Sequence, residues 1–215
     1  MNEQERAEEH LRTIRRLMER GTIYRAISAP TALVGGLLSV GASEMWLGGG
    51  GATSENPRGF LALWMAVLAL TAATNAVILV LGARERKEAV ISASMKAALI
   101  AIAPAFIAAG GFTLLFAGWP CDPLNELTVT VVWAVCYGLG LLATSHFAPR
   151  SLTMLGAAFL AAGLGTMLAF QYGGGFFMRN LDGRTASFFM AGTFGLFHFI
   201  YAVCAWPRRR GEPEP

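Results

Sequence analysis

The sequence predicts an all-α integral membrane protein: a bundle of six transmembrane helices with an amphipathic cytoplasmic helix in front of it. Three observations support this class. Hydrophobic residues make up 54% of the 215 residues and charged residues only 14%, whereas soluble domains carry about a quarter charged residues. Six apolar stretches come close to the roughly 20 residues that a helix needs to cross a bilayer. The basic residues gather on one side of these stretches.

The six predicted transmembrane helices are residues 24–46, 59–82, 97–119, 127–147, 152–172 and 187–206. Together they use most of the chain, so residues 22–206 form one transmembrane domain between an N-terminal segment, 1–21, and a C-terminal tail, 207–215. Segments such as 97–109 do not alternate between apolar and polar residues, and in hydrocarbon such a segment satisfies its backbone hydrogen bonds as a helix. The charged first 22 residues do not resemble a cleavable signal peptide, so we expect the first span to remain in the protein.

The positive charges predict the orientation. Fourteen of the 17 Lys and Arg residues lie on one side of the spans, and only Arg58, Arg179 and Arg184 lie on the other. Short loops rich in Lys and Arg stay in the cytoplasm, so both termini are predicted to be cytoplasmic, in agreement with an even number of spans. Because no processing segment is recognisable, the bacterial plasma membrane, that is the inner membrane, is the expected location.

The same basic residues predict contacts with lipid. Positive side chains beside a membrane attract anionic head groups, and this explanation is preferred to nucleic-acid binding. The expected partners are therefore the bilayer and its anionic lipids, with no nucleic acid. The residues expected to make these contacts are Arg15, Arg16, Arg20, Arg84, Arg86, Lys87, Arg208 and Arg209.

Residues 3–20 are expected to form the amphipathic helix. Ala7, Leu11, Ile14 and Met18 recur at spacings that place them on one face, and acidic residues precede basic ones, as the helix dipole favours. This apolar stripe can pack on the protein's own cytoplasmic face, on the lipid interface, or on a partner protein or second copy of the chain. The sequence leaves these three alternatives open.

Small residues and prolines predict how the spans pack. Pairs and triplets four residues apart let helix backbones approach closely in lipid. We expect them to build the bundle, with an oligomer formed by a leftover small-residue face as the alternative: Ala157, Ala161 and Gly165; Ala32 and Gly36; Ala69 and Ala73; Ala191 and Gly195. Pro30 and Pro104 each remove a backbone donor and can kink a helix. They are candidate hinges, with a static kink as the simpler alternative. Trp46, Trp119 and Trp206 at span ends, and Trp64 near one, are expected to be interfacial anchors.

Ionisable residues within the spans are functional candidates because they are expensive in lipid. No Asp, Glu, Lys or Arg lies near the middle of a span, and His198, roughly 12 Å from the inner end of its helix, is the deepest. It is expected to bond to a neighbouring helix through Asn75 or Tyr137. Together with His146, these residues form the candidate polar site.

The same census disfavours several activities. A proton-coupled carrier, a voltage sensor and a retinal protein all need charged residues that the spans lack, and no phosphate-binding loop is present. The three cysteines are far apart and have no metal-binding spacing, so no metal, other cofactor or disulfide framework is predicted.

Three functions remain, and no motif of a known family decides between them. The first choice is a non-catalytic scaffold, accessory subunit or regulator that acts through its cytoplasmic face. The alternative is a small transporter or channel for a neutral or apolar solute, which predicts a central cavity lined by Asn75 and His198. The third is a haem- or metal-dependent redox or lipid-modifying protein that uses His146 and His198. An enzyme is therefore the less favoured class.

Overall fold

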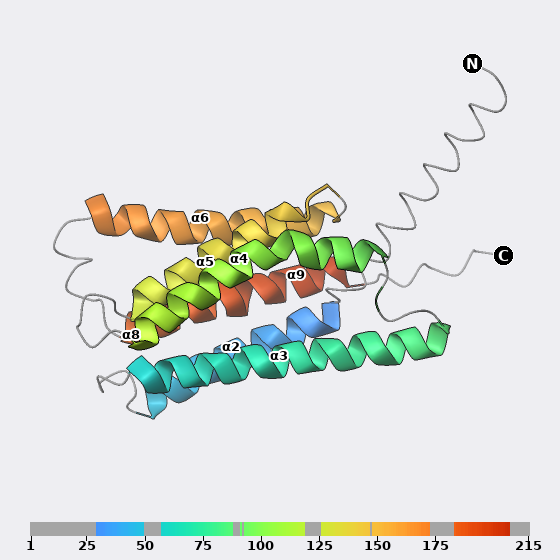
Figure 1. The fold of residues 1–215 in the computed structure, drawn as a ribbon. Helices are drawn as coiled ribbons and strands as arrows, with labels where there is room; N and C mark the ends of the chain where they lie inside the picture. Colours follow the sequence, from blue (N-terminus) through green and yellow to red (C-terminus); the bar gives the residue numbers. More distant parts are fainter. Residues whose placement is uncertain are drawn as a thin grey trace, which may run out of the picture.

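The structure, a computed structural model, describes residues 29–49, 57–87, 91, 93–118, 126–146, 148–172 and 183–206. All regular secondary structure in this part of the chain is helical (Figure 1). The elements are α2 (Ala29–Gly48), α3 (Pro57–Arg86), α4 (Ala93–Gly118), α5 (Glu126–Ala143), α6 (Arg150–Tyr172), α8 (Gly183–Met190), the π-helix η2 (Ala191–Phe197) and α9 (His198–Ala205). The predicted all-α class is confirmed. The predicted helix at 3–20 and the tail at 207–215 lie outside the described residues.

Five of the helical segments are long and apolar enough to cross a membrane. They are α3, α4, α5, α6 and the continuous segment from α8 through η2 to α9, which we call the C-terminal rod. Five such helices are typical of a multi-pass membrane protein. Eleven large apolar side chains of α3 and α4 are exposed, as expected where the solvent is lipid.

Several helix ends differ from the predicted span limits by four residues, and α4 and the C-terminal rod begin at Ala93 and Gly183, before the expected 97 and 187. The fourth span was expected to reach residue 147, but α5 ends at Ala143, because Thr144 and Ser145 donate their N–H groups to carbonyls only three residues back and so tighten the helix into a turn. In contrast, α3 continues beyond the expected end at residue 82 to Arg86.

The C-terminus of α3 has a physical explanation in its sequence. Lys87 has a φ of 53°, and its N–H donates to the Arg84 carbonyl at 3.2 Å, so the chain leaves the helix through a left-handed residue. Arg84 and Arg86 therefore belong to the last turn of α3 and not to a loop. Their positive charge is favourable there because the helix dipole is negative at this end.

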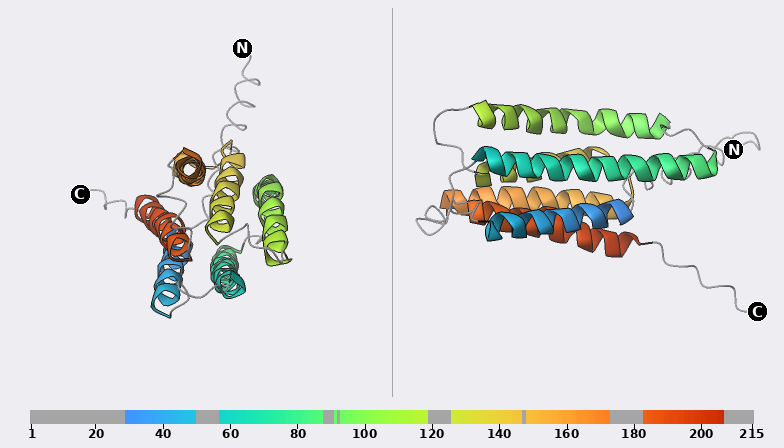
Figure 2. Two further views of the ribbon diagram at one scale, coloured as in Figure 1. Left: turned by 90° about the vertical axis from the view of Figure 1, so that its left-hand side faces the viewer. Right: turned by 90° about the horizontal axis from the view of Figure 1, so that it is seen from below.

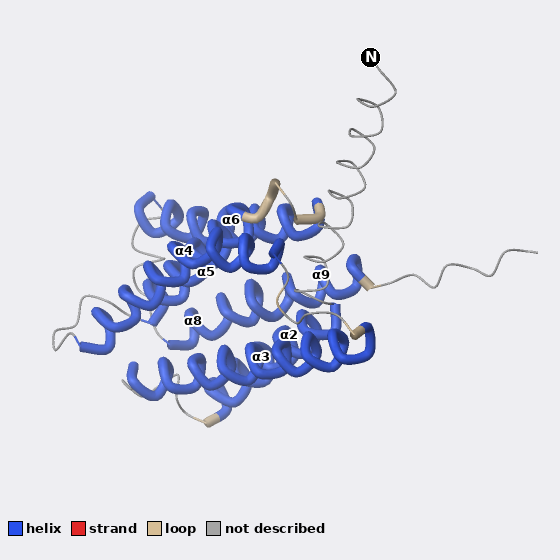
Figure 3. The backbone as a smooth tube through the Cα atoms, turned by 45° about the vertical axis from the view of Figure 1, so that its right-hand side comes forward, coloured by secondary structure: helices blue, strands red, loops and turns tan. Residues whose placement is uncertain are grey.

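The helices lie side by side along one common direction (Figure 3). Seen end-on, they form a ring in chain order, which the C-terminal rod closes by packing against α2 and α6 (Figure 2). The strongest contacts join α5 to α6, α4 to α5, and α2 to α3 and to the rod. The ring has one weak join, because α3 and α4 make few contacts with each other.

Glycines bring α5 and α6 together at backbone contact. A Cβ atom added at Gly138 would lie 2.7 Å from the Gly156 carbonyl oxygen and 2.8 Å from the Leu160 nitrogen. One added at Gly163 would lie 2.6 Å from a methyl group of Val135. Neither position has room for any side chain, so this pair of helices is close-packed along most of its length.

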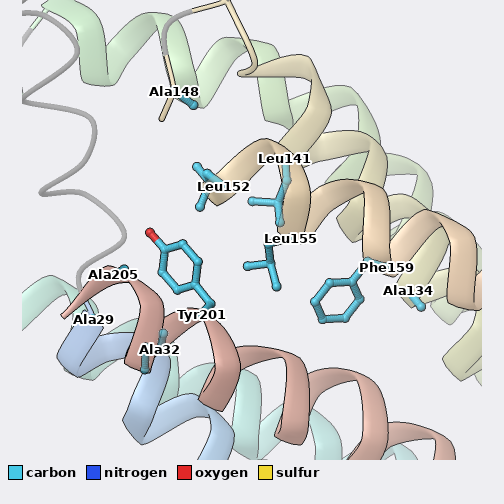
Figure 4. Packing of buried hydrophobic residues seen from close by; sticks show 11 residues of the cluster. Ala29, Ala32, Ala134, Leu141, Ala148, Leu152, Leu155, Phe159, Tyr201 and Ala205 are labelled. Atoms are coloured by element: carbon cyan, nitrogen blue, oxygen red, sulfur yellow. The ribbon is translucent and has the colours of Figure 1, made fainter. Parts of the chain in front are cut away.

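The buried core between α2, α5, α6 and the C-terminal rod continues this close packing. Phe159 has no exposed surface and belongs to one buried cluster with Leu155 and Tyr201 (Figure 4). Ala32 and Ala202 are small enough to let α2 approach the rod there. In lipid this packing, and not the removal of apolar surface from water, holds helices together.

The small-residue prediction is correct for two of the four sets. Ala32 is buried, and a Cβ at Gly36 would lie 3.1 Å from the Gly195 carbonyl oxygen, so α2 and η2 do cross at small residues. The prediction is wrong for Ala157, Ala161 and Gly165, which are exposed on α6, and for Ala69 and Ala73, which are exposed on α3. On α6 the close contacts come instead from glycines spaced seven residues apart.

A second cluster corrects the role expected for two tryptophans. Trp46 and Trp64 are 9% and 3% exposed, and Phe60 packs between them with ring centroids 5.4 and 6.1 Å away. They are therefore core residues and not interfacial anchors. Trp206, which follows the C-terminal rod, is 53% exposed and keeps the predicted surface position.

Candidate functional site

A cavity of about 460 Å³ lies inside the ring. Its wall is formed by α2, α3, α4, α5 and the C-terminal rod, and α6 contributes none of its lining. The size is within the range of about 300–1,000 Å³ that small-molecule sites have. Among the described residues, no Asp, Glu, Lys or Arg lines it, so this part of the wall is mainly apolar with a few uncharged polar groups.

The cavity exists because α3 and α4 are held apart. Where α4 passes the cavity it presents Ala105, Ala109 and Gly110, which are too small to fill the space towards α3. On α2 the cavity is lined by Gly35, where an added Cβ atom would lie 3.1 Å from the methyl group of Thr71 on α3. The cavity therefore lies at the place in the ring where α3 and α4 make few contacts with each other.

The opening of the cavity faces the side of the bundle. Met65 and Leu68 on α3, and Phe106 and Leu114 on α4, line the cavity and are also exposed, by 38%, 51%, 44% and 76% respectively. These exposed positions all belong to the two helices that barely touch. Around membrane-spanning helices such a lateral opening meets the acyl chains of the lipid, so apolar molecules can reach the cavity from the bilayer.

Tyr137 of α5 and His198 of α9 form the central polar group of the wall. The Tyr137 hydroxyl lies 2.9 Å from His198 Nε2, and His198 Nδ1 lies 2.9 Å from the Phe194 carbonyl oxygen. Because a carbonyl only accepts, Nδ1 must carry a proton. In the neutral ring Nε2 is then the acceptor, so the Tyr137 hydroxyl is assigned as the donor.

Aromatic rings hold this pair in place. The Tyr137 ring contacts Phe159 and Phe194 at centroid distances of 4.7 and 5.4 Å, and the Phe106 ring at 6.4 Å. Phe194 stacks on the His198 ring at 6.2 Å with an angle of 16° between the planes. Such edge-to-face and stacked contacts fix both side chains in one orientation, so the site is preorganised.

The π-helix places Phe194 and His198 on the wall. Met190, Phe194 and His198, at four-residue spacing, all line the cavity, and the π-helical stretch Ala191–Phe197 lies among them. Wide turns of this kind are rare and often occur at functional sites. Here the His198 side chain bonds to the Phe194 carbonyl, one turn earlier in the chain.

A second polar pair joins α4 to α5 at the cavity. Trp133 Nε1 donates to Thr113 Oγ1 at 2.8 Å, and Thr113 Oγ1 donates to the Ala109 carbonyl at 2.7 Å. Both side chains line the cavity. They were missed in the sequence, although a tryptophan in the middle of a span, far from either interface, is an unusual position that singles out Trp133.

The structure brings together only part of the predicted polar site. Tyr137 and His198 are hydrogen-bonded, whereas Asn75 accepts a bond from Thr31 of α2 at 3.0 Å and does not line the cavity. His146 is exposed in the turn after α5. It follows Tyr137 by nine residues, or about 13 Å along a helix, so it is remote from His198.

This separation bears on the redox hypothesis. Its two histidines do not converge on one position, and within the described residues no three His, Cys, Asp or Glu side chains are grouped as metal ligands. Cys136 on the cavity wall and Cys204 on the exposed face of α9 are free thiols.

The two candidate hinges occupy different positions. Pro30 is the second described residue of α2 and is exposed. Pro104 lies inside α4, where it removes the N–H that would bond to the Ile100 carbonyl. Its neighbours Ala105 and Phe106 line the cavity, so of the two prolines Pro104 is the one placed to affect the site.

Only three of the predicted lipid-contact residues lie in the part of the chain that the structure describes. Arg84 and Lys87 are exposed at the end of α3. Arg86 ends that helix. Outside the described residues lie Arg15, Arg16, Arg20, Arg208 and Arg209, as does the apolar stripe of Ala7, Leu11, Ile14 and Met18.

Comparison of the chain with protein-family models, curated proteins and solved structures gives no match. The geometry of the site is therefore the basis for the function proposed below.

Proposed function

We propose that the protein has six transmembrane helices with both termini in the cytoplasm of a bacterium, in the inner membrane. The sixth helix is α2, whose 20 residues give a length of about 30 Å, the thickness of the hydrocarbon core. It packs within the ring against α3 and the C-terminal rod. The one-sided distribution of basic residues supports the orientation, and exposed Arg84 and Lys87 would then meet anionic head groups at the inner surface.

We propose that this bundle binds a small, uncharged, mainly apolar molecule taken from the bilayer, as a binding protein or carrier for that molecule. The observation that supports this is the cavity of about 460 Å³ between α3 and α4. An ion would lose its hydration in this cavity without gaining a charged partner. A neutral apolar molecule instead exchanges lipid contacts for protein contacts.

The scaffold function, the first choice from the sequence, stays a prediction. It depends on residues 1–21, which lie outside the described residues. The cavity lies wholly within the described residues, and for this reason we prefer the alternative in which the bundle itself acts on a solute.

The test is chemical identification of what the protein retains. We would purify it in mild detergent, extract it with organic solvent and analyse the extract by mass spectrometry. The proposal predicts an uncharged lipophilic compound in stoichiometric amount. It also predicts loss of this compound in Ala109→Trp, because Ala109 lines the cavity and the indole would fill it.

Ala108→Trp is the matched control, since Ala108 is exposed and does not line the cavity. Retention of the compound in Ala108→Trp, with loss in Ala109→Trp, supports the proposal. An identical extract from both variants, or no stoichiometric compound from the unmodified protein, would contradict it.

A further inference from the structure

Most polar hydrogens of the cavity wall are already used in hydrogen bonds within the protein. The Tyr137 hydroxyl donates to His198 Nε2, and His198 Nδ1–H donates to the Phe194 carbonyl. Both ring nitrogens of the histidine are therefore in use, and so is the single proton of the tyrosine. The Tyr137 oxygen, however, still has lone pairs with which to accept a hydrogen bond.

The second polar pair, Trp133 and Thr113, and also Ser39 donate their polar hydrogens to other groups of the protein. Trp133 Nε1–H is donated to Thr113, and the Thr113 hydroxyl proton to the Ala109 carbonyl. The Ser39 hydroxyl proton is donated to the Gly35 carbonyl at 2.8 Å. Thr113 and Ser39 thus keep their hydroxyl protons in hydrogen bonds within the protein.

Three further side chains of the wall contain polar atoms. Trp64 Nε1 has no partner among the described residues, but it is fully buried in the wall and cannot reach a ligand. The Cys136 thiol is a weak donor. Thr71 carries a hydroxyl of its own and is therefore a separate variable in the experiment.

Resting on the proposed function, we infer that the ligand is an uncharged lipid alcohol whose hydroxyl proton is donated to the Tyr137 oxygen. Its apolar part occupies the rest of the cavity between α3 and α4 and leaves through the lateral opening. A ligand with only acceptor groups, such as an ether, an ester or a ketone, can accept from the Thr71 hydroxyl but has no proton to donate to the Tyr137 oxygen. An ionised head group finds no counter-charge.

The expected preference for an alcohol over an ether is modest, because in the empty site the donors of Tyr137 and His198 already have hydrogen-bond partners within the protein. When an ether binds, the Tyr137 hydroxyl keeps its bond to His198, so no buried donor is left without a partner. The alcohol gains one additional hydrogen bond, which corresponds to roughly 3- to 10-fold in affinity.

The experiment measures equilibrium binding of radiolabelled dodecan-1-ol and of dodecyl methyl ether to the full-length protein in lipid nanodiscs. Each value is referred to the concentration of the probe in empty nanodiscs of the same lipid. We expect roughly 3- to 10-fold tighter binding of the alcohol. The double variant Tyr137→Phe/His198→Phe should lose this preference, because it lacks both polar groups.

A single variant tests the direction of the hydrogen bond. In His198→Phe the Tyr137 hydroxyl loses its acceptor and becomes free to donate, so binding of the ether should increase relative to that of the alcohol. Thr71→Val should leave the preference unchanged. Loss of the preference in Thr71→Val would assign the contact to the threonine and overturn the inference.

The outcomes separate the inference from the function on which it rests. Equal binding of both probes to the unmodified protein overturns the lipid-alcohol inference and leaves the binding function standing. No binding of either probe above empty nanodiscs contradicts both. Since these two outcomes are read from the unmodified protein, the test does not depend on the folding of any variant.

Discussion

The two sides of the bundle are packed in opposite ways. Between α5 and α6, Gly138, Gly156 and Gly163 bring backbones into contact, and no volume is left. Between α3 and α4, the small residues Ala105, Ala109 and Gly110 face a cavity, and the two helices barely touch. Small residues therefore do not by themselves mean close packing. They permit it where a partner helix approaches, and they leave a cavity where none does.

The difference in packing suggests that the two sides of the bundle have different roles, one in stability and the other in binding. On the α5–α6 side, Phe159 is fully buried (Figure 4), and its ring packs against the ring of Tyr137. This close-packed side therefore holds Tyr137 in position. The α3–α4 side has the exposed apolar residues and the opening. We expect substitutions on the first side to affect folding and substitutions on the second to affect binding.

The largest effect on stability is expected from Gly138→Ala. The new Cβ would meet the Gly156 carbonyl oxygen at 2.7 Å and the Leu160 nitrogen at 2.8 Å, and since these are backbone atoms, the helices must separate. Overpacking of this kind costs about 1–3 kcal/mol or more. The free energy of unfolding, from titration with a denaturing detergent, should fall by that amount.

Gly165→Ala is the matched control on the exposed face of α6. A Cβ there has no neighbour within 4 Å, so alanine should stabilise the helix slightly, by about 0.5–1 kcal/mol. If both variants unfolded at the same detergent concentration, the close contact between α5 and α6 would be disproved.

Tyr137→Phe tests the polar group at the boundary between the two sides. The substitution leaves His198 Nε2 without its donor in an apolar environment, which costs about 1–3 kcal/mol. Tyr172→Phe serves as the control because Tyr172 is 81% exposed and should change stability by much less. The same detergent titration measures both, and an equal effect of the two substitutions would refute the assigned Tyr137–His198 bond.

The smallest effect is expected from Thr31→Val, which removes the hydrogen bond between α2 and Asn75 of α3. Hydrogen bonds between transmembrane helices contribute about 0.6 kcal/mol on average and up to about 1.7 kcal/mol. Thr74→Val is the control, since the Thr74 hydroxyl bonds within its own helix to the Leu70 carbonyl. A larger loss of stability in Thr74→Val than in Thr31→Val would contradict a role of this bond in holding α3 to α2.

The helical class was predictable because hydrocarbon leaves an apolar backbone few alternatives. The positions of the helix ends were harder to predict from the sequence. At α5 the predicted span ran to residue 147, but the polar residues Thr144, Ser145 and His146 form a turn after the helix has ended at Ala143. At α3 the basic residues after Gly82 suggested a loop, whereas arginines are compatible with the last turn of a helix.

The packing faces and the cavity could not be predicted for a different reason. Residues that face lipid and residues that face another helix are equally apolar, so α2, α3 and α4 have almost no amphipathic asymmetry. The sequence thus could not tell the buried glycines of α6 from the exposed Gly165. His198 stood out because it is polar, and Tyr137 was one of its two expected partners. The π-helix that positions His198 left no recognisable signal.

The most direct test of the account is whether an apolar molecule occupies the α3–α4 cavity at a saturable site. Tryptophan fluorescence of the protein in nanodiscs would be titrated with 1-bromododecane, whose bromine quenches tryptophan on contact. The account predicts a saturable component of quenching that decreases in Trp133→Phe, since Trp133 lines the cavity, and persists in Trp206→Phe, which alters only an exposed ring. Quenching that rises linearly with probe concentration, equally in both variants, would mean simple partition into lipid and would contradict the account.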